Sequence, residues 1–205
     1  MCAINRPGVW KRVPCFNHTL QLAVSVAEKI LNYTDFFALI NKLVGSLNHS
    51  TNFTKEFHDI QKEHFPRDEP LDLFQYCPTR WNSRHLMLER ILLLKDPLIE
   101  LTDGANTIKE LTTSDWRKVT AYVNVFKALK EATKLMEGDS YVTLSLYIPI
   151  IEGLKNILES NSESSETEEE LYNVLKESVL ERFDFAKKDE LLITAMMVDP
   201  RFKVY

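Results

Sequence analysis

The amino-acid sequence predicts a mainly α-helical protein. Glycine is scarce, at 5 of 205 residues, against a usual frequency of about 7%, and this scarcity favours helices joined by short connections. Apolar residues recur at helical spacing along most of the chain. No stretch shows the strict alternation between turn residues that is typical of strands. The longest apolar runs, such as 144–151, are far too short to cross a bilayer.

Seven helices are expected, and each is placed by its apolar period. In chain order they span 16–31, 34–64, 81–95, 114–136, 143–158, 168–186 and 190–198. Asn17 is a plausible cap for the first helix, and Thr79 or Asn82 for the third. Pro97 ends or kinks the third helix. Pro149 bends the fifth, because an interior proline removes one backbone hydrogen bond.

The net charge of −5 is unevenly distributed. Between residues 159 and 181 there are eight glutamates and one lysine, whereas residues 1–18 carry three basic residues and no acid. Phosphate contacts need lysine and arginine, so a uniformly acidic protein would be a poor candidate for binding nucleic acid. The concentration of acid in one segment leaves room for a basic surface elsewhere.

The cysteines and the first residues indicate the compartment. Cys2, Cys15 and Cys77 form an odd set without the spacing of a disulfide framework, which is typical of a reducing environment. Residues 1–13 scatter basic and apolar residues rather than forming a charged-then-apolar leader. We therefore expect a cytosolic or nuclear protein.

Three stretches carry a resemblance to a known family. They read CFNHTLQL at 15–22, CPTRWNS at 77–83 with MLER at 87–90, and MMVDPRFK at 196–203. In this order and at this spacing they resemble the hAT superfamily of DNA transposases and the BED-zinc-finger-containing proteins derived from it. The stretches 111–116 and 141–144 are also similar to that family. Each stretch alone is weak evidence for the family, but all of them in this order make a specific signal.

The resemblance implies a fold and a division of the chain. The expected fold is the helical insertion domain of an RNase H-like (hAT) transposase, with only fragments of the RNase H-like core. Residues 1–14 would be a connecting segment from the truncated core, and 15–198 the helical domain, with a flexible acidic linker near 159–167. Residues 199–205 would be a truncated return toward the core.

The resemblance also implies that this chain has no catalytic residues. In the family, two aspartates and a glutamate in the RNase H-like core hold two divalent metals, as two-metal phosphoryl transfer requires. The second aspartate precedes the first stretch, yet no aspartate occurs here before Asp35, and the glutamate follows the third stretch. We expect neither an enzyme nor a cofactor in this chain. Full-length members carry divalent metal in the nuclease core and zinc in the BED finger.

Arg80 and Trp81 are the first candidates for a DNA-binding site. By resemblance they lie near the cleaved DNA end, where an aromatic ring stacks on an unpaired base, a contact worth about 1–3 kcal/mol. Arg80 would contact phosphate or stack beside the ring. The alternative role for Trp81 is that of a core residue that anchors its helix.

Cys15 and His18 are the second pair of candidates, because the resemblance places their stretch near the DNA and the catalytic core. The alternative is a half-buried cysteine and a capping histidine at a helix start. Together with Cys77 and His85 they would also offer four zinc ligands. That site is less favoured, since Cys77 and His85 stand eight residues apart and structural sites usually supply ligands in close pairs.

The sequence thus predicts a transposase-derived helical domain that is DNA-associated or related to transcription and is not catalytic. Its expected partners are DNA and other proteins, or a further copy of itself; neither a membrane nor a small-molecule substrate is expected. The nucleus follows from the resemblance, with the cytosol as the alternative. The alternative function is a protein-interaction scaffold, or a non-functional fragment of a decayed transposable element.

Overall fold

A computed structural model describes residues 12–65, 69–77, 80–103, 110–138, 141–160 and 165–202. Within these ranges the chain is helical and contains no strand, so the mainly α-helical prediction is confirmed. None of the helices in these ranges combines the length and the apolar character that crossing a membrane requires. The α-helices are α1 (Phe16–Ile30), α2 (Tyr33–Asn48), α3 (Thr51–His64), α4 (Trp81–Leu93), α5 (Lys95–Asp103), α6 (Thr113–Met136), α7 (Tyr147–Glu159), α8 (Glu166–Phe183) and α9 (Glu190–Val198).

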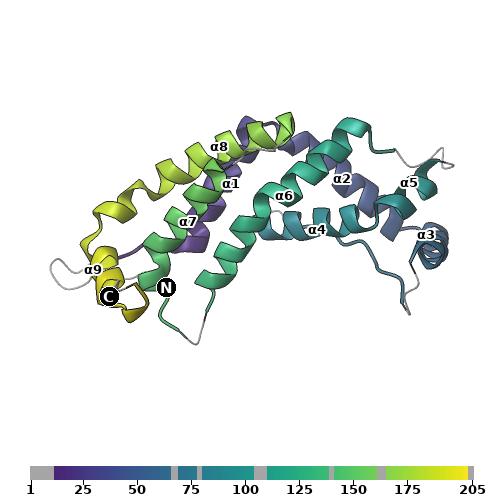
Figure 1. Ribbon diagram of the computed structural model, residues 1–205. Coiled ribbons are helices and arrows are strands. Elements are labelled where there is room, and N and C mark those ends of the chain that lie inside the picture. The colour runs from purple at the N-terminus through teal and green to yellow at the C-terminus, as the bar shows by residue number, and fades with distance from the viewer. Residues whose placement is uncertain are drawn as a thin grey trace.

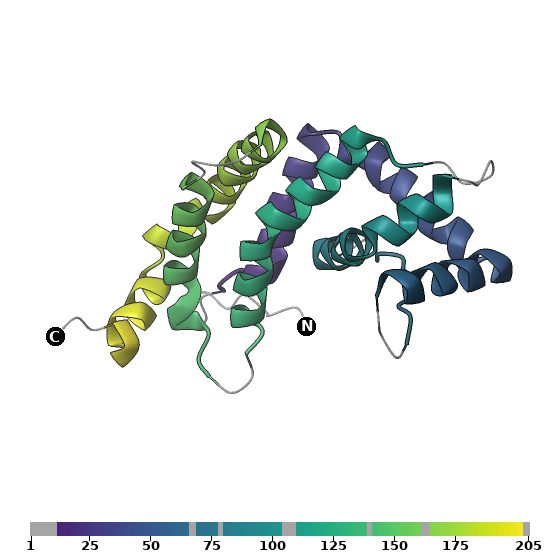
Figure 2. The ribbon, with the colours of Figure 1, turned by 45° about the vertical axis from the view of Figure 1, so that its right-hand side comes forward.

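The molecule is elongated and bent, with α9 at one end and α3 and α5 at the other (Figure 1). The longest helix, α6, runs through the middle and packs against α1, α4, α7 and α8. In the turned view of Figure 2, α7, α8 and α9 lie on one side of α1 and α6, and α2 to α5 lie on the other. Because α6 contacts both groups, it joins the two halves of the molecule.

Aromatic side chains fill the core in both halves. Tyr122 and Phe126, one turn apart on α6, are stacked with 3.9 Å between their ring centroids. The α2 ring of Phe37 packs edge-on against Tyr122, with 5.4 Å between the centroids. In the other half, Phe16 of α1 packs against Tyr147 of α7 and Phe183 of α8. Each cluster draws its rings from different helices, so aromatic packing fixes how those helices are arranged.

One predicted helix is divided in the structure and one helix, α5, was not predicted, which accounts for nine α-helices in the described residues instead of seven. The helix predicted over 34–64 breaks at His49, because the Ser50 hydroxyl caps a new helix by accepting the Phe53 N–H at 3.4 Å. The third helix ends before Pro97, which lies in the first turn of α5. Proline suits that place, where its missing N–H would have no partner.

Three further expectations need correction. The N-cap of α1 is Cys15 and not Asn17. Pro149 lies in the first turn of α7, preceded by a short 3-10 helix (η1, Leu144–Leu146), so it does not bend a helix interior. The end of the predicted linker is helical, because Ser165 forms a capping box with Glu168. Residues 161–164 of that linker lie outside the described ranges, as do residues 1–11 and 203–205 of the predicted terminal segments.

Candidate nucleic-acid interface at the junction of α1 and α4

The first two of the three sequence stretches meet in space. The backbone N–H of Trp81, at the start of α4, donates a hydrogen bond of 2.8 Å to Oε1 of Gln21 on α1. The first amides of a helix have no partner within the helix, and Arg80 at the N-cap supplies no side-chain bond. Gln21 therefore caps α4 from a neighbouring helix. We call Cys15, His18, Gln21, Arg80 and Trp81 the α1–α4 junction.

This cap differs from the predicted one. The side chain of Asn82 makes no cap bond at the start of α4, and Thr79 lies outside the described residues. Ser83 instead ties the incoming loop to the helix: its hydroxyl oxygen accepts the Cys77 N–H at 2.9 Å and lies 2.6 Å from the carbonyl oxygen of Arg80. The backbone at Arg80 is therefore fixed by two side chains: Ser83 bonds to the backbone of Cys77 and Arg80, and Gln21 bonds to the backbone of Trp81.

The Trp81 side chain lies in the core and is 3% exposed. Its ring centroid is 5.7 Å from that of Phe126 on α6 and 6.3 Å from that of His85 one turn on. A buried ring is not available to stack on a base in this conformation. The structure places Trp81 in the packing role, as the residue that anchors the start of α4 against α6.

The other three predicted site residues are exposed: Arg80 at the start of α4, and Cys15 and His18 at the start of α1. Cys15 is a free, exposed cysteine and not a half-buried one. His18 does not cap, because no side chain makes a cap bond at the N-terminus of α1. The surface of the junction thus presents a guanidinium, an imidazole and a thiol.

The four residues considered as zinc ligands are not brought together. His85 is fully buried, and its Nε2 lies 3.2 Å from the carbonyl oxygen of Val123 on α6, whereas Cys15, His18 and Cys77 are exposed. Among the residues that the structure describes, no three His, Cys, Asp or Glu side chains are grouped as metal ligands. Burial lowers the pKa of His85, which favours the neutral ring in the fold.

A buried polar network lies behind the junction and links three helices. Nη1 of Arg84 on α4 lies 2.6 Å from Oε2 of Glu28 on α1, and the Tyr122 hydroxyl of α6 donates to Oε1 of Glu28 at 2.7 Å. The Arg84 guanidinium also lies 5.2 Å from the ring centroids of Phe37 and Tyr76. Both charged side chains are therefore paired and enclosed by aromatic rings.

Burial sets the protonation behaviour of this network. It raises the pKa of Glu28, and the nearby Arg84 charge opposes that rise. Burial and the adjacent Glu28 carboxylate raise the pKa of Tyr122 well above its usual value. Tyr122 consequently remains a hydrogen-bond donor throughout the physiological range, which suits its contact with Glu28.

Three residues of the site, Gln21, Glu28 and Arg84, were not predicted from the sequence. Glu28 did leave a signal, because it stands four residues after Val24 and so on the apolar side of α1, where an acid needs a buried partner. Gln21 and Arg84 belong to the first two stretches or their immediate continuation, but their spacing alone does not reveal their partners.

The third stretch folds against the segment that includes η1. The carboxylate of Asp199, just after α9, accepts from Nη2 of Arg201 at 2.6 Å and from the Ser145 hydroxyl at 2.5 Å. Nη2 of Arg201 also donates to the carbonyl oxygen of Val142 at 3.2 Å. The hydrogen bonds from Arg201 and Ser145 hold the pKa of Asp199 well below its usual range. The third stretch therefore pairs with 141–144, as the first pairs with the second.

Comparison with known proteins supports the resemblance seen in the sequence. Residues 13–125, more than half of the chain and including the whole α1–α4 junction, match the family described as the ZBED1 RNase-like helical domain. The chain is also 25% identical over 198 residues to zinc finger BED domain-containing protein 4 of Homo sapiens, covering 96% of this chain but only 17% of that relative. The predicted resemblance and fold are confirmed. The chain belongs to the family of ZBED1 RNase-like helical domains, the helical domain of transposase-derived proteins.

Proposed function

We propose that this domain is a DNA-associated, non-catalytic module of a nuclear, transposase-derived protein, and that its α1–α4 junction contacts the DNA backbone. The observation that carries the proposal is the Gln21–Trp81 hydrogen bond. It joins the two stretches that resemble the DNA-proximal segments of hAT transposases, and Arg80, His18 and Cys15 of these stretches are exposed.

The chemistry of the junction suits phosphate. Helix N-termini attract anions through their dipole and through those N–H groups that are left free. α1 begins at Phe16 and α4 at Trp81, whose own N–H is already taken by Gln21. An arginine adds a permanent charge and can bind phosphate in a bidentate manner. We assign phosphate contact to Arg80 and His18, whereas Trp81 keeps Arg80 in position from within the core.

The absence of catalysis is part of the proposal. By resemblance, the carboxylates that hold divalent metals belong to the RNase H-like core and not to the helical domain that this chain matches. The chain is expected to leave supercoiled plasmid and flapped duplex DNA intact in Mg²⁺ or Mn²⁺. Nicking by the purified chain that is lost on chelation would overturn this part of the proposal.

The binding test is a titration of a flapped DNA duplex with the whole chain at several salt concentrations. Binding with a Kd of about 10⁻⁴–10⁻⁶ M near physiological salt is expected for backbone contact. Arg80→Ala should weaken binding and reduce the slope of log K against log salt by about 1. Lys55→Ala, an exposed cation on α3 at the other end of the molecule, is the matched control and should leave binding unchanged.

The nuclear location is supported by the name of the human relative, which refers to a BED zinc finger. Fractionation of cells that express the whole protein tests it. Recovery of the protein in the cytosolic fraction alone would contradict it.

The alternative function, a protein-interaction scaffold, is favoured by a different observation. Several large apolar side chains are exposed, among them Leu135 of α6 and Ile157 of α7, which are each 50% exposed and line the same groove. Contiguous apolar surface of this kind often marks an interface. If the wild-type chain shows no salt-sensitive DNA binding, the scaffold function replaces the proposed one.

A further inference from the structure

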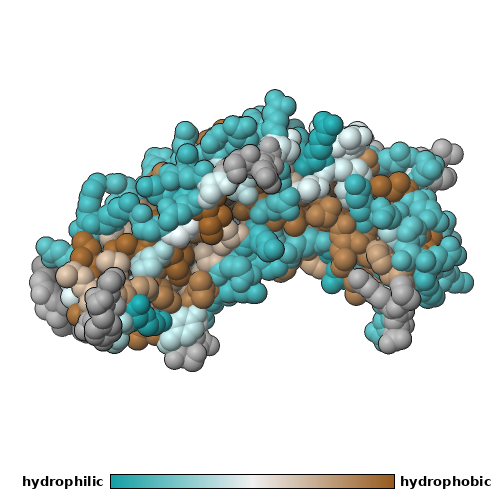
Figure 3. Space-filling view, in the orientation of Figure 1, coloured by the Kyte–Doolittle hydropathy of each residue, from teal (hydrophilic) through white to brown (hydrophobic). Residues whose placement is uncertain are grey.

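An apolar groove of about 550 Å³ lies between α6 and α7. The buried side chains of Ala132 and Leu154 line it, together with Ala128 and Gly153. In the space-filling view of Figure 3, apolar residues gather on the face where α6 and α7 run side by side. A groove with so little polar lining is suited to protein contact and not to a charged ligand.

The fold has room for a side chain in the groove at Gly153. A Cβ atom at this position would meet no heavy atom within 4 Å, so no neighbour excludes a side chain. Glycine in a helix interior is nevertheless unfavourable relative to alanine. The fold therefore carries a local cost at Gly153 that no packing contact requires.

The two half-exposed apolar side chains lie at opposite ends of the groove. Leu135 is in the last turn of α6, and Ile157 is in the last turn of α7. Residues 137–146 connect the two helices, which pack against each other in opposite directions. Leu135 is therefore level with the start of α7, and Ile157 with the middle of α6 near Asn124, which lines the same groove.

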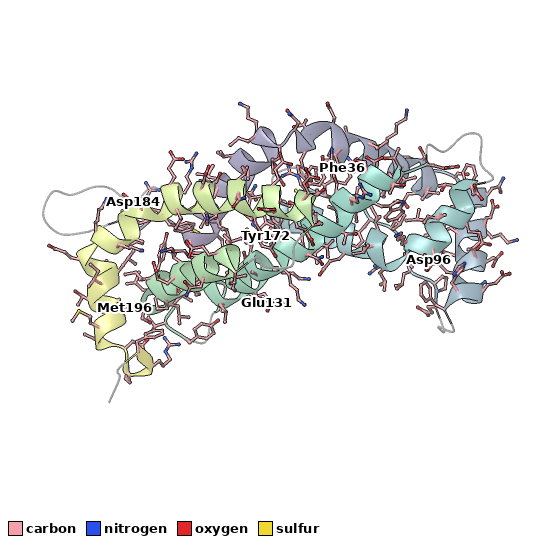
Figure 4. The ribbon with its side chains drawn as sticks, turned by 45° about the horizontal axis from the view of Figure 1, so that its top comes forward. Phe36, Asp96, Glu131, Tyr172, Asp184 and Met196 are labelled. Atoms are coloured by element: carbon pink, nitrogen blue, oxygen red, sulfur yellow. The ribbon has the colours of Figure 1, made fainter. Side chains whose placement is uncertain are left out.

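The charged residues of the groove are self-complementary. Lys127 and Glu131, both exposed, lie one turn apart along the α6 edge, and Figure 4 shows Glu131 on α6 where it runs beside α7. If two copies of α6 pack in opposite directions, Lys127 of each copy faces Glu131 of the other. The same operation brings Leu135 of one copy against Ile157 of the other.

We propose that a second copy of this chain docks in the α6–α7 groove, with the two α6 helices antiparallel about a twofold axis near Ala128. Such an interface is isologous, so each favourable contact occurs twice. In the free chain Glu131 pairs with Lys134, with 3.4 Å between Oε1 and Nζ, on the surface. An exposed pair of this kind contributes little and does not prevent the contact. The inference does not rest on the proposed DNA contact.

A charge-swap series tests the proposal by sedimentation equilibrium of the whole chain. Wild type should dimerise with a Kd on the order of 10⁻⁶–10⁻⁵ M. Lys127→Glu and Glu131→Lys should each weaken the dimer about tenfold or more, because like charges then face each other twice. The double variant should restore it. Lys55→Glu on α3 adds the same charge change away from the groove and should have no effect.

A steric series checks the same face independently of charge. Gly153→Leu fills the groove and should abolish the dimer, whereas Gly153→Ala should leave a dimer and retain or raise the helicity seen by circular dichroism. The proposal fails if wild type remains monomeric at about 100 μM, a concentration well above that Kd range. It also fails if the dimer is insensitive to Lys127→Glu, or if the double swap does not restore it; another occupant or another face would then account for the groove.

Discussion

The α1–α4 junction and the α6–α7 groove depart from the usual pattern of burial in opposite ways. Behind the junction, the charged Glu28 and Arg84 lie inside the protein, at 10% and 14% side-chain exposure. At the groove, the apolar Leu135 and Ile157 lie outside, at 50% exposure each. A buried, paired charge can fix one arrangement of helices, and an exposed apolar patch can mark an interface. The first region therefore positions three helices, and docking is the role that we propose for the second.

Trp81→Ala should show the largest effect, because it empties a buried site between α4 and α6. A loss of about 3–5 kcal/mol in the free energy of unfolding is expected, as measured by urea denaturation. Leu86→Ala, an exposed residue on the same helix, is the control and should change the free energy by less than about 1 kcal/mol. Equal effects at the two positions would contradict the packing role of Trp81.

Arg84→Met should follow, with a loss of about 3 kcal/mol, because the buried Glu28 carboxylate then keeps Tyr122 as its one side-chain partner among the described residues. Adding Glu28→Gln in the same chain should recover part of the loss, since no charge is then buried alone. A double-mutant cycle by urea denaturation measures this coupling. Strict additivity of the two changes would show that the network does not act as a unit.

Gly153→Ala should act in the opposite direction, because the groove has room for a methyl group. We expect the free energy of unfolding to rise by about 0.5–1 kcal/mol. Thermal unfolding measured well below the dimer Kd isolates this effect from association. A loss of stability would mean that Gly153 is required by the fold itself.

Asp199→Asn should give the smallest effect, and one that depends on pH. The pKa of Asp199 is lowered in the fold by Arg201 and Ser145, so its contribution to stability is present above the unfolded pKa of about 4. That contribution is lost as the pH falls through the lower native pKa. The difference in stability between wild type and variant should therefore be full at pH 6 and shrink steadily as the pH falls from 4 toward 2. A difference that stays constant over this range would contradict the ion pair.

The sequence predicted the helices well where caps and the apolar period agree. The segment 190–198 has the predicted bounds, and α1 ends within one residue of its prediction. The prediction of one continuous helix over 34–64 was wrong. The apolar period continues across the break at His49, and the break is marked by the Ser50 cap. Pro97 was predicted to end or kink a helix, and Pro149 to bend the interior of one. Both prolines lie in the first turn of a helix instead.

The site was harder to predict than the fold. The sequence stretches pointed to Arg80, Trp81, Cys15 and His18, but not to which of them would be buried. Trp81 is buried because α6 brings Phe126 against it, a contact across 45 residues that no local pattern contains. The cap from Gln21 is likewise a contact between helices. Local spacing predicts helices, whereas partners distant in the sequence decide which residues remain exposed.

The most direct test of the account compares Arg80→Ala with Trp81→Phe for both DNA binding and stability. Binding is measured at low salt by fluorescence anisotropy on a flapped duplex, and stability by urea denaturation. The account predicts that Arg80→Ala weakens binding and changes the free energy of unfolding by no more than about 0.5 kcal/mol. It predicts that Trp81→Phe lowers stability but leaves the folded protein able to bind. Loss of binding in a folded Trp81→Phe variant, with full binding by Arg80→Ala, would contradict it.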